Sequence, residues 1–246
     1  LPRFQPIELV KPFIIIFIAT ILCSEKSFNI YFKYLLTFIA IVPACLLLMM
    51  QPDIGQTLLI FLAWATLVFI SGISLLIILI FFIFSLLSLV YMVFFIPKFT
   101  YIKNRILSFF NPNDGTHNFQ SDKAIDAISS GGYFGKGIGE GTLKNRVPEA
   151  HTDYIISVIS EEFGVVAIVL LLILFLSFIY NVFKKIYLEK NEKIKLVLTG
   201  TICLIIFQAL IHIGVNIRLF PTTGMTLPFL SYGGSSIVGV SILSGI

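Results

Sequence analysis

Long apolar runs separated by short polar connectors dominate the chain. A membrane-spanning helix needs about 20 mainly apolar residues. The pattern predicts seven such helices, at about residues 6–24, 34–50, 54–70, 74–96, 154–182, 195–216 and 225–246. Because the runs are apolar throughout, without the alternation of barrel strands, they favour helices. The predicted fold class is therefore all-α, a polytopic membrane helix bundle.

A long polar loop at residues 97–153 interrupts this pattern. Apolar residues at helical spacing beside two basic ones predict an interfacial helix over residues 100–112. A second helix is predicted over residues 121–129, with Ser121 as its N-cap. Loops of this length in compact proteins are usually functional or disordered, and the aromatic and apolar residues here favour function. We treat residues 1–246 as a single transmembrane domain that includes the loop.

Composition agrees with a membrane location. Of the 246 residues, 57% are hydrophobic and 12% are charged, whereas soluble domains carry about 25% charged residues. The net charge of +4 is modest, and no basic tract with interleaved aromatics suggests nucleic acid as a partner. The three cysteines lie in apolar runs without CxxC spacing, so we expect them to be packing residues. Since the chain starts at Leu1 rather than Met, we expect a fragment that lacks an N-terminal part.

Lysine placement predicts the orientation in the membrane. Five lysines lie in residues 184–195 and two in residues 24–33. Short connectors rich in lysine favour the cytoplasmic side. Counting helices outward then places residues 51–55, the 97–153 loop and residues 218–224 together on the extracytoplasmic side.

A glycine-rich stretch, SSGGYFGKGIGEGT, follows the second predicted loop helix. Its six glycines permit tight or left-handed turns. A nucleotide-binding P-loop has the pattern GxxxxGK[ST] between a strand and a helix. Here Lys136 precedes the later glycines and no strand leads in. The pattern therefore disfavours nucleotide binding and leaves a structural loop or a lipid-headgroup loop as alternatives.

The loop ends in RVPEAHTDY, which places Asp153 at the start of an apolar run. A carboxylate at the water–hydrocarbon boundary can have a raised pKa and can reach a lipid-linked substrate. Glu149, four residues earlier, would share a helical face with it. The plainer interpretation is a solvated helix start capped by Thr152. However, His151 and Arg146 lie close to Asp153 in the sequence, and basic residues can neutralise a phosphate. We therefore predict a site for group transfer from a lipid pyrophosphate.

Ionisable residues in or beside other apolar runs are further candidates. Glu8 and Lys11 lie three residues apart, and such residues usually face the protein interior or a water-filled cavity. An internal ion pair is the plain interpretation. Asp53 lies in a turn between two predicted spans, on the same side as Asp153. His212 is expected to be packed and hydrogen-bonded rather than a ligand, and no spacing of His, Cys or carboxylates predicts a zinc site.

Four motifs, in this order, resemble the SEDS family (shape, elongation, division and sporulation). They are QPIELVK, QPDIGQT, RVPEAHTDYIISVISEEFG and NIRLFPTTGMTLPFLSYGGSS. The last motif resembles the cell-division branch more than the elongation branch. Family members typically have ten transmembrane helices, so the seven predicted here would correspond to the last seven. Two positions depart from the family pattern: Ile7 replaces the usual Ser beside Glu8, and Gln56 stands where a Thr is expected.

The resemblance implies a peptidoglycan glycosyltransferase that polymerises lipid II into glycan strands during cell division. It implies Asp153 as the catalytic residue, Glu8 and Lys11 as a membrane-embedded charged pair, and Asp53 as the acid of the second motif. Contacts with the substrate are then expected from Glu8, Lys11, Asp53, Arg146, Glu149, His151 and Thr152. The expected partners are lipid II, a class B penicillin-binding protein transpeptidase and other cell-division proteins, at the bacterial inner membrane with the site on the periplasmic side.

The expected reaction is an inverting glycosyl transfer with Asp153 as the general base. A cation must offset the charge of the departing pyrophosphate. The sequence offers Arg146 and neighbouring basic residues, or a divalent ion such as Mg²⁺ or Mn²⁺, although no ligand set identifies a metal. Two alternatives stay open: a flippase that moves lipid II without making a bond, and a non-catalytic scaffold that recruits the transpeptidase.

Overall fold

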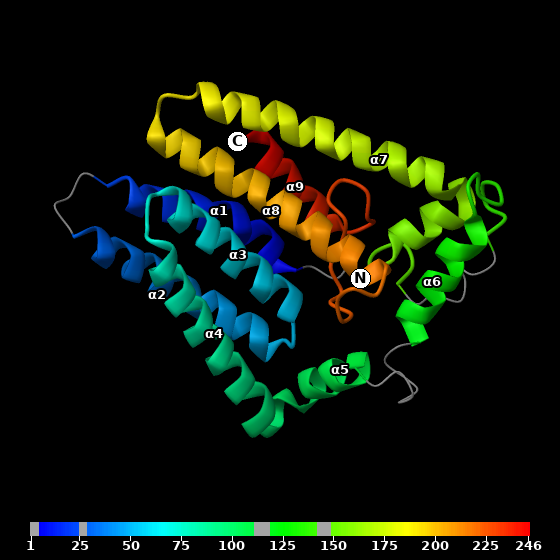
Figure 1. The fold of residues 1–246 in the computed structure, drawn as a ribbon, viewed down its shortest axis with the longest axis horizontal. Coiled ribbons are helices and arrows are strands. Elements are labelled where there is room, and N and C mark those ends of the chain that lie inside the picture. The colour runs from blue at the N-terminus through cyan, green and yellow to red at the C-terminus, as the bar shows by residue number, and fades with distance from the viewer. Residues whose placement is uncertain (1–4, 25–28, 111–118, 142–148) are drawn as a thin grey trace.

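The computed structural model describes residues 5–24, 29–110, 119–141 and 149–246, and most of these are helical. Each predicted span contains one helix. These helices are α1 (Pro6–Leu22), α2 (Ile30–Met50), α3 (Ile54–Ile70), α4 (Leu75–Phe95), α7 (Ile155–Leu188), α8 (Glu192–Asn216) and α9 (Gly234–Gly245). The predicted all-α class is therefore confirmed (Figure 1).

The helices differ in their capacity to cross a bilayer. By length and composition, α2, α4, α7 and α8 are sufficient, whereas α3 and α9 are apolar but shorter. Helix α9 begins only at Gly234, so the predicted span over residues 225–246 is too long. Its first part is an irregular segment that contains Pro228 and is held by polar contacts described below. The chain is a multi-pass membrane protein, and the number of seven crossings stays a prediction.

Helix α8 is the centre of the bundle. It packs against α1, α3, α7 and α9, and Figure 1 shows it between α7 on one side and α1 and α3 on the other. In α8, 72% of the most apolar window is buried, against 6% in both α4 and α7. The exposed side chains of α4 and α7 are mostly large and apolar, as expected for helices that face lipid.

The described ends of the helices lie in two groups at opposite ends of the bundle (Figure 1). At one end lie the last residues of α1 and the first residues of α8, two helices that pack against each other. At the other end Arg105 Nη1 donates a hydrogen bond to the Thr222 carbonyl at 3.0 Å. This grouping is confirmed. The assignment of the second group to the extracytoplasmic side stays a prediction.

Helix α7 is broken at Gly164, where φ is 78°. A break leaves carbonyls before it and amides after it without helical partners. The glycine-rich stretch supplies those partners. Lys136 and Gly137 amides donate to the carbonyls of Glu161 and Glu162 at 2.9 and 3.1 Å, and Val165 and Val166 amides donate to the carbonyls of Gly132 and Tyr133 at 3.0 and 3.2 Å. The stretch therefore has a structural role.

Two helices in the long loop match the prediction, after a short 3₁₀ turn (Pro97–Phe99). They are α5 (Thr100–Phe110) and α6 (Phe119–Gly131). The prediction of Ser121 as the N-cap of the second helix is wrong, because α6 begins two residues earlier and Ser121 lies buried inside it. Helix α6 packs against α7 and α8, which the local pattern does not reveal.

Candidate functional site

Asp153 lies at the end of a turn that immediately precedes α7. Its amide donates to the Glu149 carbonyl at 3.0 Å, so the two acids are one helical turn apart, as predicted. The plainer interpretation, in which Thr152 caps the helix, is wrong. The cap position is Tyr154, which makes no side-chain capping bond, and Thr152 Oγ1 instead donates to the Glu149 carbonyl at 3.1 Å and to the Glu149 carboxylate at 3.2 Å.

The irregular segment before α9 holds this turn in place. The Tyr232 amide donates to the His151 carbonyl at 3.0 Å, and Ser231 Oγ donates to the Thr152 carbonyl at 2.7 Å. From the other side, Asn216 of α8 donates to the Asp153 carbonyl at 3.1 Å. The backbone of the turn is therefore fixed by residues that follow it by 60 or more positions.

Residues 222–226, here called the 222–226 segment, bring the distant parts of the site together. The Thr222 carbonyl accepts from Arg105, as described above. A Cβ at Gly55 would lie 2.8 Å from the Thr223 Cβ and 2.6 Å from the Met225 sulfur, so the start of α3 is in tight contact with the segment. At Gly224, where φ is 66°, a Cβ would lie 3.5 Å from Asp153 Oδ2. Loop helix α5, helix α3 and the Asp153 turn thus meet at one segment.

The Asp153 carboxyl has a raised pKa of about 6. Burial is the largest cause, because it disfavours the charged form, and repulsion by Glu149 adds to it. A hydrogen bond from Thr152 and the charge of Arg105 lower the pKa. Burial also raises the pKa of Asp53, whereas the Gln56 amide bond, Lys11 and Arg105 lower it. The two acids and Arg105 therefore belong to one electrostatic environment, and a group with a pKa near 6 suits proton transfer near neutral pH.

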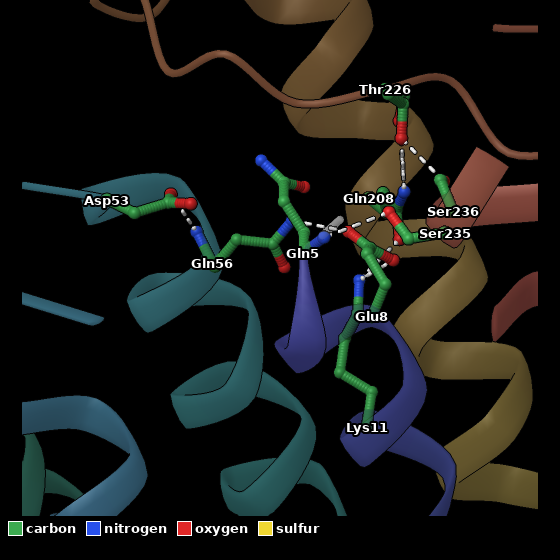
Figure 2. A network of polar contacts seen from close by, with 9 residues as sticks. All are labelled: Gln5, Glu8, Lys11, Asp53, Gln56, Gln208, Thr226, Ser235 and Ser236. Atoms are coloured by element: carbon green, nitrogen blue, oxygen red, sulfur yellow. Dashed lines mark hydrogen bonds and ion pairs between the residues drawn. The ribbon is translucent and has the colours of Figure 1, made fainter. Parts of the chain in front are cut away.

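The predicted ion pair between Glu8 and Lys11 is present at 2.7 Å, with both side chains 1% exposed. It extends into a wider polar network (Figure 2). Glu8 accepts from Gln56 Nε2 at 2.6 Å, and Lys11 donates to Gln208 Oε1 at 3.1 Å. Gln208 in turn donates to the Thr226 carbonyl at 3.0 Å. The network thus connects α1, α3 and α8 with the 222–226 segment.

Three polar residues of α8 line the side of the helix that faces the site. Gln208, His212 and Asn216 follow each other at intervals of four, which places them on one helical face. His212 Nδ1 lies 2.7 Å from the Met225 carbonyl, so the predicted packed, hydrogen-bonded histidine is confirmed. Gln208 was missed in the sequence, although the spacing from His212 and Asn216 was a signal that could have found it.

Arg105 is another residue of the site that was not predicted from the sequence. It appeared only as a basic residue of an interfacial helix, whereas its guanidinium contacts Thr222 and the Tyr101 hydroxyl (2.6 Å). The predicted substrate residue Arg146 lies outside the described residues. Within the described part of the chain, no group of three or more His, Cys, Asp or Glu side chains is placed to hold a metal ion.

An apolar cavity of about 280 Å³ opens between α2, α3 and α4. Its lining includes Met49, Ile54 and Thr57 close to Asp53, and it continues along α4 past Phe82 and Met92.

Fold and site together define a polytopic membrane protein with a polar, carboxylate-containing site at one end of an apolar helix bundle. The chain belongs to the family of cell cycle proteins that includes FtsW, RodA and SpoVE, whose family model matches residues 2–246. This confirms the resemblance to the SEDS family.

Individual relatives support the cell-division branch. The probable peptidoglycan glycosyltransferase FtsW of Caulobacter vibrioides is 35% identical over 246 residues, covering 98% of this chain and 61% of that protein. The protein of the same name from Nitrosomonas europaea is 37% identical over 251 residues, which cover 99% of this chain and 64% of that protein. This chain thus spans about three fifths of the length of these curated relatives.

Two solved structures are similar as well. One belongs to a peptidoglycan synthase complex described as coordinating polymerization and crosslinking, with a TM-score of 0.75 and 28% identity, covering 98% of this chain and 67% of that one. The other is the rod shape determining protein RodA of Thermus thermophilus, with a TM-score of 0.65 and 27% identity. The match covers 98% of this chain and 63% of that one.

Proposed function

We propose that the complete protein is a peptidoglycan glycosyltransferase that polymerises lipid II during cell division, with Asp153 as its general base. The observation that carries this proposal is the position of Asp153. It is a partly buried carboxyl with a pKa near 6, held rigidly at the end of the bundle beside Arg105 and the 222–226 segment. The names of the relatives with 35–37% identity support the same reaction.

In the proposed reaction, Asp153 accepts the proton of the 4-hydroxyl of the acceptor N-acetylglucosamine. The hydroxyl oxygen forms a bond to C1 of the donor N-acetylmuramic acid. The bond from C1 to the pyrophosphate oxygen breaks, and its electron pair leaves with undecaprenyl pyrophosphate, so the configuration at C1 is inverted. General-base catalysis supplies roughly 10²–10⁴-fold in rate, and positioning of the two substrates supplies much of the remainder.

Arg105 is the described residue best placed to offset the charge of the leaving group. A guanidinium binds phosphate oxygens through several N–H groups in a fixed geometry, and two protein contacts already orient this one. Arg146 keeps the same proposed role, together with Glu149, His151 and Thr152 as substrate contacts near the base. A divalent ion such as Mg²⁺ or Mn²⁺ is a further proposed source of positive charge, and no step here depends on it.

The apolar cavity between α2, α3 and α4 supports a lipid-linked substrate. Its lining is apolar, it runs along a lipid-facing helix, and it begins near Asp53. We place the isoprenyl chain of lipid II there, with the site on the periplasmic side of the inner membrane. A class B penicillin-binding protein is the proposed partner, since the similar synthase complex couples polymerization to crosslinking.

The proposal is tested with the full-length protein, purified with and without the transpeptidase and supplied with lipid II. Wild type is expected to form glycan strands, and Asp153→Asn is expected to lose polymerisation by at least 10²-fold while remaining folded. Polymerisation by the Asp153 variant at the wild-type rate would contradict the proposed base. Lipid II that crosses the membrane unchanged in mass would indicate a flippase, and cell-division activity that is independent of Asp153 would indicate a scaffold.

A further inference from the structure

Gln56 forms hydrogen bonds with two acids of the site, Asp53 and Glu8. It lies in the first turn of α3, directly after the glycine that packs against the 222–226 segment. Its backbone amide donates to Asp53 Oδ1 at 3.0 Å. Its side-chain Nε2 donates to Glu8 Oε1 at 2.6 Å, and the residue is 1% exposed. Figure 2 shows the side chain extending from the Asp53 turn toward the Glu8–Lys11 pair.

The orientation of the Gln56 amide is determined by Glu8. A flipped amide would set its oxygen against a carboxylate oxygen, which is repulsive, so nitrogen must face Glu8. Among the described residues, Gln56 Oε1 has no hydrogen-bond partner. The bond to Glu8 is therefore the contact that orients the buried side chain, and hydrogen bonds to charged groups are stronger than those between neutral groups.

The length of this side chain matters for the contact. A shorter side chain such as Thr, whose hydroxyl is two bonds closer to the backbone, could not extend as far toward Glu8. Gln56 thus gives this chain a direct contact between the Asp53 turn and the buried pair.

The contacts form an unbroken path across the site. From Asp53 it passes through Gln56 to Glu8, then through Lys11 and Gln208 to Thr226. Thr226 is two residues after Gly224, which lies against the Asp153 carboxyl. The path therefore starts at one acid of the site and ends on the segment that contacts the other.

We infer that Gln56 is a positioning residue, which transmits the placement of the Glu8–Lys11 pair to Asp53 and, through the 222–226 segment, to Asp153. This inference rests on the proposed function. Since Gln56 is argued to act through other residues, its loss is expected to affect kcat rather than KM.

The test uses full-length protein, lipid II as the probe, and steady-state measurement of kcat and KM. Gln56→Met keeps the length of the side chain but cannot donate to Glu8, and its backbone amide still binds Asp53. We expect kcat to fall about tenfold with KM changed less than twofold. Gln56→Asn keeps the amide but is one methylene too short to reach Glu8, and it is expected to show the same loss of kcat. This variant replaces Gln56→Met in the test if the Met variant does not accumulate. Gln120→Met makes the same chemical change in α6, outside the path, and is expected to keep the wild-type kcat.

A double substitution separates positioning from a general loss of stability. If Gln56 and Lys11 belong to one path, Gln56→Met combined with Lys11→Met should lower kcat by much less than the product of the two single effects. Multiplicative effects would overturn the inference. So would a wild-type kcat in both Gln56 variants, or a raised KM with unchanged kcat, which would indicate direct substrate contact. If wild type itself forms no glycan, or Asp153→Asn retains full activity, the proposed function fails instead.

Discussion

At the residue scale, the charge state of Asp153 reflects competing surroundings. Burial and Glu149 favour its protonated form, whereas Thr152 and Arg105 favour the carboxylate. A pKa near 6 leaves the group mostly ionised at pH 7 and still basic enough to accept a proton. A more exposed aspartate would be a weaker base, and a fully buried one would stay protonated.

The pH dependence of polymerisation tests this balance. Because the base must be deprotonated, log(kcat/KM) should fall with slope one as pH decreases below about 6, and should level off above it. Glu149→Gln removes a negative charge that raises the pKa of Asp153, so the break should move to lower pH. Arg105→Gln removes a positive charge that lowers the pKa, so the break should move to higher pH. Shifts in the same direction would rule out this electrostatic account.

The same pKa has a consequence for stability. In the folded state Asp153 binds its proton more tightly than in the unfolded chain, so stability decreases as pH rises from about 4 to about 6 and stays lower above that. Asp153→Asn removes this effect. We expect it to raise the free energy of unfolding by roughly 1–3 kcal/mol at pH 8 and much less at pH 4.5. Thermal unfolding of both proteins in detergent at pH 8 and pH 4.5 measures this change in stability. An equal change at the two pH values would contradict the prediction.

At the element scale, the break in α7 depends on the glycine-rich stretch. Four backbone hydrogen bonds join residues 132–137 to the two sides of Gly164. These bonds connect the loop to the short helical segment that begins at Ile155. Because the turn that carries Asp153 immediately precedes that segment, the bonds contribute to the position of the site.

Two glycines with similar φ angles test this connection. Gly135 and Gly139 have φ values of 77° and 82°, which lie in the region that favours glycine, so alanine strains the backbone at both. At Gly135 a Cβ would also lie 2.2 Å from the Glu162 carbonyl oxygen, whereas at Gly139 no atom lies within 4 Å. We expect Gly135→Ala to lower the melting temperature by several degrees more than Gly139→Ala, as measured by scanning fluorimetry in detergent. Equal shifts would mean that this contact does not stabilise the fold.

At the scale of the whole molecule, the two groups of connectors predict the orientation. The lysine-rich connector between α7 and α8 lies at the opposite end from α5 and α6, the described helices of the 97–153 loop (Figure 1). If the proposed function is correct, the loop end faces the periplasm, because glycan strands are assembled outside the cytoplasm.

Labelling of single cysteines in intact cells tests this orientation. In a protein with its native cysteines replaced by alanine, Glu140→Cys should react with a membrane-impermeant maleimide, and Lys190→Cys should react only after the membrane is opened. Both positions are exposed, so accessibility of the side chain is matched. The reverse pattern would place the site in the cytoplasm and would contradict polymerisation of lipid II on the periplasmic side.

Much of the fold could be predicted from the sequence, because apolar length and lysine placement are local properties. The seven predicted segments each contain a helix, and the Glu8–Lys11 pair was evident from its spacing. Errors arose where contacts between distant segments decide the local structure. Residues 225–233 are apolar enough to suggest a helix, yet they form polar contacts with the Asp153 turn. Ser121 looked like a cap, yet it is buried inside α6.

The membrane class, the helices, the motifs and the candidate acids follow from the amino-acid sequence alone, since each of these depends on composition or on spacing along the chain. The three-dimensional fold was needed to show that Arg105, Gln56 and Gln208 belong to the site, and that residues 222–226 join its parts. Such contacts depend on side chains up to about 200 positions apart meeting at one end of the bundle. Their geometry is set by the packing of the helices around α8, which no local pattern encodes.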